Sequence, residues 1–304
     1  MKKIPVILDT DIGGDIDDTW ALAVLLRSPM LDTKLVVTAL EKEEDQLSRT
    51  RITCKQISES GMSGVPVGAG LAVDKYDHPL IGWAKDYDLA SYDGPVYEDG
   101  VQKMVDIIMA SEEEITILCL APLTNIAEAL KREPKIAEKA RLVLVGGSIY
   151  NGHSLDAITK ASDYNIRADI PAARKVLEAS WDITLVPLDV TAHIVLGDDG
   201  YQKLLSKRET DLFIKTTLNA FDHWMVVGNC TYYKTHSTCL YDTAAIYIAE
   251  QGDYNVIMED HKLVIDDGGY TNDDENGKLC HCAVYWKYKD MFYKYLVDRM
   301  CGEA

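Results

Sequence analysis

The chain contains no long run of basic residues and no long run of apolar ones. It has 31 Lys and Arg residues against 49 Asp and Glu residues, which gives a formal net charge of −18. A surface this negative repels the phosphate backbone of nucleic acids and disfavours docking on anionic membranes. A membrane-spanning helix needs about 18 or more consecutive apolar residues, and no such stretch is present. We therefore expect neither a nucleic acid nor a membrane as a partner.

We also expect neither an export signal nor a disulfide framework. Its first residues, MKKIPVILDTDIGG, include two lysines but no apolar core of signal-peptide length. The seven cysteines are odd in number and scattered. These features predict reduced thiols and a cytoplasmic location. In the one tight cluster, Cys280-His281-Cys282, strand alternation would place the histidine opposite the cysteines, which favours a structural role over a zinc site.

The composition fits a globular protein with a large core, because 47% of the 304 residues are hydrophobic and 26% are charged. Apolar runs typical of strands alternate with helical patterns. We expect strands at 4–8, 34–40, 65–69, 115–120, 141–145 and 183–188, and helices at 19–26, 45–60, 98–110, 123–132 and 170–179. We expect residues 201–250 to be mainly helical, followed by strands near 255–265 and 279–286 and a helix to about 301. This order predicts one α/β domain over residues 1–304, with an open, mostly parallel sheet flanked by helices.

The most informative segment is an acidic loop between the first strand and the first helix. It reads Asp9-Thr10-Asp11-Ile12-Gly13-Gly14-Asp15-Ile16-Asp17-Asp18, with five carboxylates in ten residues. Crowded like charges must be compensated, and the hard cations Ca²⁺ and Mg²⁺ prefer oxygen ligands. Helix capping would explain one or two of the aspartates but not five. Because ligands of open α/β sheets bind outside the carboxyl ends of the strands, we expect this loop, residues 120–125 and residues 146–165 to meet around one pocket.

Several segments resemble the nucleoside hydrolase family, in the family's order along the chain. The acidic loop resembles the DTDxGxDD signature, with two extra residues before the Asp pair. Residues 121–127 (APLTNIA) resemble GPLTNIA, residues 142–147 (LVLVGG) resemble VLMGG, and residues 162–166 (SDYNI) resemble AEFNI. Residues 188–191 match LDVT, and Tyr241-Asp242 falls where the family has an aromatic residue or His before Asp. The resemblance implies a Rossmann-like nucleoside hydrolase fold.

The resemblance also implies roles for individual residues. Four groups would bind a calcium ion: Asp11, Asp18, Asp242 and the backbone carbonyl of Leu120. Asp11 would in addition accept a proton from the attacking water, with no covalent protein intermediate, as in inverting glycoside hydrolysis. Asp17, Asp163 and Asn165 would bind the sugar, although Asp163 replaces the family's usual Glu. Asp9 would orient the loop, and Asp15 lies in the insertion and has no family counterpart. Capping remains the alternative for Asp242 and Asn165.

The sequence departs from the family pattern at three further places. Tyr241 stands where the best-known members have a His that protonates the leaving base; a tyrosine is a poor acid here but a good ring for stacking on a base. A tyrosine packed in the core is the alternative. The family's TxxGN turn is absent, since residues 40–45 read LEKEED, and Ala157 stands where many members have Asn. Other candidate acids are His193, His223 and His236.

Residues 74–97 have no clear periodicity and are expected to form a long loop that carries Trp83, Tyr87 and Tyr92. Long loops over an α/β pocket often act as lids. The three aromatic residues would then cover the bound base, or they would pin the loop to the core. We favour the core position.

Two hydrolase hypotheses and one binding hypothesis follow. The resemblance implies calcium-dependent hydrolysis of the N-glycosidic bond of a nucleoside or related N-riboside, with release of base and ribose, by a homo-oligomer (dimer or tetramer). A phosphatase of the haloacid dehalogenase type also begins with a strand followed by D-x-D, but would need a downstream Lys and a further acidic pair. A non-catalytic nucleoside-binding or sugar-binding protein of the same fold could have lost the His and the Asn turn.

Overall fold

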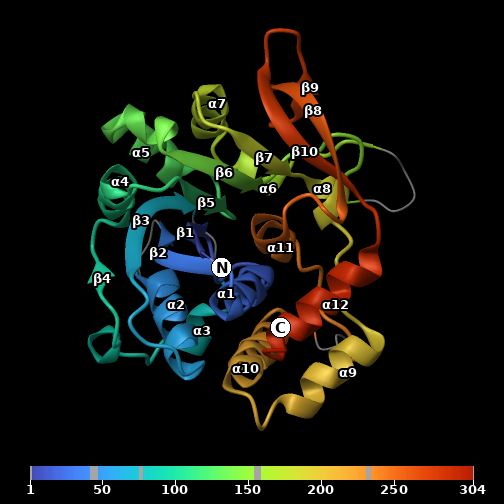
Figure 1. The fold of residues 1–304 in the computed structure, drawn as a ribbon. Coiled ribbons are helices and arrows are strands. Elements are labelled where there is room, and N and C mark those ends of the chain that lie inside the picture. The colour runs from blue at the N-terminus through green and yellow to red at the C-terminus, as the bar shows by residue number, and fades with distance from the viewer. Residues whose placement is uncertain (1, 42–46, 75–77, 154–158, 231–233, 304) are drawn as a thin grey trace.

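The computed structural model of the protein describes residues 2–41, 47–74, 78–153, 159–230 and 234–303. Within these residues, ten strands form one sheet in the order β4-β3-β2-β1-β5-β6-β7-β10-β8-β9 (Figure 1). The strands are β1 (Ile4–Thr10), β2 (Leu31–Glu41), β3 (Val67–Asp74), β4 (Val96–Tyr97), β5 (Ile115–Cys119), β6 (Ala140–Val145), β7 (Ile183–Val186), β8 (Val256–Ile265), β9 (Thr271–Asp273) and β10 (Lys278–Trp286). Strands β1 to β7 are parallel, β10 continues them in parallel beside β7, and β8 and β9 are antiparallel. The predicted mostly parallel α/β sheet is confirmed.

Helices cover both faces of the sheet (Figure 1). They are α1 (Asp17–Arg27), α2 (Ser48–Glu59), α3 (Ile81–Ala84), α4 (Gly100–Ala110), α5 (Thr124–Arg132), α6 (Tyr164–Arg167), α7 (Ile170–Glu178), α8 (Leu188–Thr191), α9 (Asp198–Lys207), α10 (Leu212–Val227), α11 (Thr243–Gln251) and α12 (Lys289–Met300), with 3₁₀ turns η1 (Leu89–Ser91) and η2 (Pro134–Glu138). Helices α1, α2, α10, α11 and α12 share one hydrophobic core, and α4, α5 and α7 share the other. Because side chains alternate along a strand, Val6 and Leu8 enter the first core while Ile7 enters the second.

The chain reverses its direction across the sheet between β1 and β5. From β1 it proceeds outward through β2, β3 and β4, and it then returns to place β5 on the other side of β1. The backbone N–H of Leu120, just after β5, donates to the carbonyl of Asp9 in β1 at 2.8 Å. Such a switch point leaves a crevice at the carboxyl ends of the two strands, where open α/β sheets bind their ligands. The acidic loop begins at this crevice.

The largest departures from the predicted elements lie in two connecting regions. Residues 74–97 contain α3, η1 and β4, short elements that have too few residues to show a period. Between α10 and α11, the described part of residues 228–242 forms no helix, although α9, α10 and α11 make residues 201–250 mainly helical, as predicted. Gly228 ends α10, and Asn229 has a left-handed φ of 53°, which stops the helical path.

Trp83, Tyr87 and Tyr92 pack against the protein and do not line the central cavity. Tyr92 is buried and donates its hydroxyl to the carbonyl of Val65 at 2.7 Å. The Tyr87 hydroxyl lies 2.7 Å from that of Ser58, and Trp83 packs beside the first core. The core position favoured for these residues is confirmed.

The predicted alternation in β10 is also confirmed. Cys280 and Cys282 are buried in the second core, while His281 points outward and its Nδ1 lies 2.7 Å from a carboxylate oxygen of Asp260. This arrangement separates the histidine from the two thiols. In the part of the chain that the structure describes, no helix has the length and apolarity required to cross a bilayer.

Candidate active site

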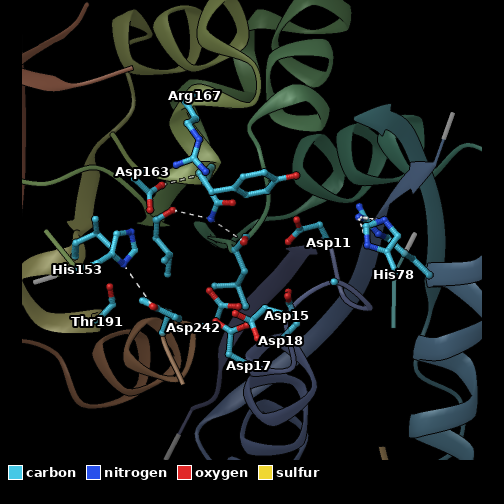
Figure 2. A pocket seen from close by; sticks show the side chains of 18 of the residues that line it. Asp11, Asp15, Asp17, Asp18, His78, His153, Asp163, Arg167, Thr191 and Asp242 are labelled. Atoms are coloured by element: carbon cyan, nitrogen blue, oxygen red, sulfur yellow. Dashed lines mark hydrogen bonds between the residues drawn. The ribbon is translucent and has the colours of Figure 1, made fainter. Parts of the chain in front are cut away.

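A cavity of about 440 Å³ opens at the switch point. Its walls come from the acidic loop, the ends of β5 and β6, the segment around α6, the start of α11, and residues from α2 and the segment before α3. Every residue that the resemblance assigned to the site lines this cavity: Asp11, Asp17, Asp18, Leu120, Asp163, Asn165, Tyr241 and Asp242. The structure therefore brings together residues that are more than 230 positions apart in the sequence (Figure 2).

Three buried carboxylates form the floor of the cavity. One oxygen each from Asp17, Asp18 and Asp242 lies within 4.8 Å of the others. Asp17 and Asp18 open α1, and Asp242 directly precedes α11. Neither helix start has a side-chain capping hydrogen bond, so the capping alternative does not account for these aspartates. Figure 2 shows the three side chains gathered together, with Asp15 beside them and Asp11 facing them.

The electrostatics of this cluster favour a bound cation. Burial is the main cause that raises the pKa values of Asp17, Asp18 and Asp242 well above the ordinary range, and the neighbouring carboxylates raise them further. The Thr10 hydroxyl donates to Asp18, and the charge of Arg49 also lowers its pKa, but neither offsets the burial. A buried group of oxygen donors without enough local positive charge is the donor set that Ca²⁺ and Mg²⁺ prefer. The residues present therefore fit a hard divalent cation.

The other two groups expected to bind the metal lie at the same place. Asp11 is only partly buried, lines the cavity, and its charge raises the pKa values of Asp17, Asp18 and Asp242. The Leu120 carbonyl accepts a hydrogen bond from Asn165 Nδ2 at 2.9 Å, and a carbonyl oxygen has a second lone pair that can accept a further partner. The three carboxylates that lie closest together are Asp17, Asp18 and Asp242. The resemblance assigned Asp17 to the sugar and assigned Asp11 to the metal in its place.

Asp9 lies behind the acidic loop, and its pKa is raised to about 7, chiefly by complete burial. Its Oδ1 accepts a hydrogen bond from Asn125 Nδ2 at 2.8 Å. The Asn125 side chain also accepts from the backbone N–H of Leu71, at the far side of β2, at 2.7 Å. These bonds join the ends of β1 and β3 to the start of α5, and they hold Asp9 away from the cavity.

Asp163 and Asn165 line the opposite wall. Asp163 caps α6 by accepting from the backbone N–H of Asn165 at 2.9 Å, and burial raises its pKa to about 6. The Asn165 amide donates to the carbonyls of Leu120 and Val145, at the ends of β5 and β6. Asn165 therefore does not act as a loop cap; it fixes the carbonyl that faces the acidic cluster.

Tyr241 and His153 form the third wall. The Tyr241 hydroxyl lies 3.5 Å from His153 Nδ1, and the two rings meet edge to face. Burial is the main cause that raises the pKa of Tyr241. Asp15, in the insertion, also lines the cavity and accepts a hydrogen bond from the backbone N–H of Ile16 at 2.8 Å.

Sequence reasoning missed several residues of this site, among them Thr10, Arg49, His78 and His153. The Arg49 guanidinium donates Nη2 to His78 Nε2 at 2.6 Å, and both side chains line the cavity. The position of Thr10 between two aspartates was a usable signal, whereas the other three come from segments without a recognisable motif. The predicted alternatives His193, His223 and His236 do not line the cavity. Residues 42–46 of the altered turn, and Ala157, lie outside the described residues.

Fold and site together define a class of protein: an α/β scaffold with a buried carboxylate cluster, suited to a hard cation, at the switch point of its parallel sheet. Comparison with known proteins identifies the family. A family model described as inosine-uridine preferring nucleoside hydrolase matches residues 6–288. The chain therefore belongs to the nucleoside hydrolase family, and it is an N-ribosyl hydrolase.

Individual relatives agree with this assignment. The non-specific ribonucleoside hydrolase RihC of Salmonella paratyphi A is 30% identical over 247 residues, which cover 78% of this chain and 77% of the relative. The RihC of Klebsiella pneumoniae is 28% identical over 251 residues, with the same coverage. Among solved structures, a purine-preferring ribonucleoside hydrolase from Gardnerella vaginalis superposes with a TM-score of 0.77 at 21% identity, over 98% of this chain and 99% of that one. The resemblance to the nucleoside hydrolases and the expected enzyme class are confirmed.

Proposed function

We propose that the protein catalyses the calcium-dependent hydrolysis of the N-glycosidic bond of a nucleoside or a related N-riboside, with release of the free base and ribose. The observation that carries this proposal is the trio of buried carboxylates, Asp17, Asp18 and Asp242, at the floor of the cavity. Oxygen donors and flexible coordination suit Ca²⁺ better than the strict octahedral geometry of Mg²⁺. The relatives with the printed activity of ribonucleoside hydrolysis support the substrate class.

Asp11, Asp18, Asp242 and the carbonyl of Leu120 would hold the ion. When bound, Ca²⁺ supplies positive charge that polarises a water molecule and the sugar hydroxyls. Asp11 faces the cluster from the partly exposed side of the cavity and would accept the proton of the attacking water. The water oxygen bonds to the anomeric carbon as the bond to the base breaks, without a covalent enzyme intermediate.

The sugar would lie between the acidic floor and the wall formed by α6. Asp17 would accept a hydrogen bond from a ribose hydroxyl, and Asp163 would accept another from across the cavity. Asn165 would hold the Leu120 carbonyl in position, and its side-chain oxygen would accept a hydrogen bond from the sugar. The ring of Tyr241 would pack against the departing base, beside His153.

The test is release of free base and ribose from a panel of nucleosides that includes inosine and uridine. We expect turnover by the wild type with calcium and a loss of at least about 100-fold with excess chelator or in Asp11→Ala, as expected for removal of a catalytic base or its metal. Binding of nucleosides without turnover under every condition would support the non-catalytic alternative. Release of phosphate from phosphate esters would support the phosphatase alternative.

We further propose that residues 1–304 act as one catalytic domain, in a homo-oligomeric (dimeric or tetrameric) enzyme of the cytoplasm. All seven cysteines are free thiols, which suits a reducing compartment. Exposed apolar side chains on β8 and β10, among them Ile257, Leu279 and Tyr285, are available for a subunit contact. Sedimentation of the purified protein measures the oligomeric state.

A further inference from the structure

Two histidines line the cavity, and they lie on opposite sides of the carboxylate cluster (Figure 2). His78 lies near Asp11, beside the glycines of the acidic loop, and His153 lies near Tyr241 and Thr191. The question is which of them can give a proton to the departing base, because Tyr241 replaces the histidine that the resemblance would place there.

The contacts of His78 make it a poor proton donor. Its Nε2 lies 2.6 Å from Nη2 of Arg49, a guanidinium that is always a donor and never an acceptor. Nε2 must therefore be unprotonated to accept this hydrogen bond. Arg49 is 1% exposed, so this ring nitrogen is occupied by a buried guanidinium and is not available to a ligand.

The contacts of His153 allow protonation. Its Nδ1 faces the Tyr241 hydroxyl at 3.5 Å, and a hydroxyl can accept as well as donate. The other ring nitrogen, Nε2, has no hydrogen-bond partner among the described residues. The imidazole is also exposed at the cavity, where a ligand can reach it. His153 thus has one nitrogen that is held and one that is free to act.

We infer that His153 is the proton donor to the leaving base and that the Tyr241 hydroxyl orients its ring. This inference rests on the proposed function. In the step, the bond between the anomeric carbon and the base nitrogen breaks, and its electron pair moves into the base. The Nε2 proton of the imidazolium passes to a ring nitrogen of the base, while the water oxygen bonds to the anomeric carbon and its proton goes to Asp11. Proton exchange with solvent restores both residues, so that one water is consumed for each bond cleaved.

The surroundings of His153 agree with this role. Burial, followed by the positive charge of Arg167, lowers the pKa of the imidazole. The lowered pKa makes the imidazolium a stronger acid, and it also reduces the fraction of His153 that is protonated at neutral pH.

The test compares two substrates that differ in their need for a proton. The hypoxanthine of inosine must be protonated as it leaves, whereas the nitrophenolate of 4-nitrophenyl β-D-ribofuranoside leaves as a stable anion. We expect His153→Gln to lower kcat for inosine by about 100-fold or more, the usual contribution of general acid catalysis. Its kcat for the nitrophenyl riboside should change by less than about 3-fold, and KM for both substrates should stay near the wild-type value, because sugar and metal contacts are intact.

Two further variants separate catalysis from structure. Tyr241→Phe removes only the hydroxyl and should produce a smaller loss, confined to inosine. His281→Gln, at an exposed position on β10, should leave both rates unchanged. Equal losses on the two substrates in His153→Gln would overturn the inference while leaving the proposed function in place. A wild type that cleaves only the nitrophenyl riboside would also overturn it, and a wild type that cleaves neither substrate would overturn the proposed function itself.

Discussion

At the scale of single residues, the buried carboxylates of the cavity suit a bound cation, but their mutual repulsion lowers the stability of the metal-free protein. Asp242 is 4% exposed, and the charges of four neighbouring aspartates act on it. We expect Asp242→Asn to lower kcat/KM for inosine by at least about 100-fold, because it removes a ligand of the proposed ion. The same substitution should raise the free energy of unfolding of the metal-free protein by about 1–3 kcal/mol, since it removes a buried like-charge repulsion. Steady-state kinetics and urea unfolding in chelator measure the two effects.

The control for Asp242→Asn is Asp260→Asn, an exposed aspartate that pairs with His281 on the outer face of β10. It should change neither activity nor stability by a large amount, because exposed ion pairs contribute about 0–1 kcal/mol. A loss of metal-free stability in Asp242→Asn would show that this carboxylate supports the fold in a way that the repulsion argument does not include.

Asp163 gives a prediction about pH. Its pKa rises from 3.8 to about 6 on folding, mainly through burial. Between these two values the folded protein binds more protons at this site than the unfolded chain, so stability falls as pH rises from about 4 to 6. The shift corresponds to about 3 kcal/mol.

Asp163→Asn keeps the oxygen that caps α6 but does not titrate. We therefore expect its advantage in unfolding free energy over the wild type to grow from pH 4 to pH 6 and then to level off. Urea unfolding of both proteins across this range, in chelator, tests the expectation. A difference between them that does not vary with pH would contradict it.

At the scale of elements, Asn125 connects three parts of the sheet edge. It is fully buried at the start of α5, donates to Asp9 in β1 and accepts from Leu71 in β3. In Asn125→Ala, the buried Asp9 carboxylate and the part-buried backbone N–H of Leu71 lose their partners, at about 1–3 kcal/mol each. We expect the free energy of unfolding to fall by about 2–5 kcal/mol, measured by urea or thermal unfolding.

Asn272→Ala serves as the matched control, because the Asn272 amide bonds to Asp266 at an exposed position. It should reduce stability by less than about 1 kcal/mol. If Asn125→Ala were equally mild, Asp9 and Leu71 would have to find new partners, and the connection would not depend on Asn125.

The elements also show what could be predicted from the sequence. The parallel strands were found because continuous apolar runs mark strands that are buried on both faces, as in β5 and β6. The start of α1 was predicted two residues too late, because Asp17 and Asp18 continue the acidic pattern of the loop that precedes the helix. The site residues within family motifs were found because those motifs are also local sequence patterns. Arg49, His78 and His153 could not be found, because their places in the cavity follow from tertiary packing, which leaves no local pattern.

At the scale of the whole molecule, a net charge of −18 and a cluster of buried aspartates both oppose folding, and calcium would relieve the second effect. An ion that binds only the folded state stabilises it by about 2.7 kcal/mol at 100 times its Kd. For a protein of this size we expect Tm to rise by about 5 °C. Thermal unfolding in chelator and in excess calcium measures the shift.

Salt would also raise Tm by screening the general surface charge, so the comparison must be made at constant ionic strength. Screening acts on all 49 acidic residues, whereas specific binding depends on the few that line the cavity. We therefore expect the calcium-dependent rise in Tm to be largely lost in Asp242→Asn and retained in Asp260→Asn. An equal rise in Tm in the two variants would show that calcium acts on the general surface charge. The carboxylate cluster would then contribute no calcium-dependent stability.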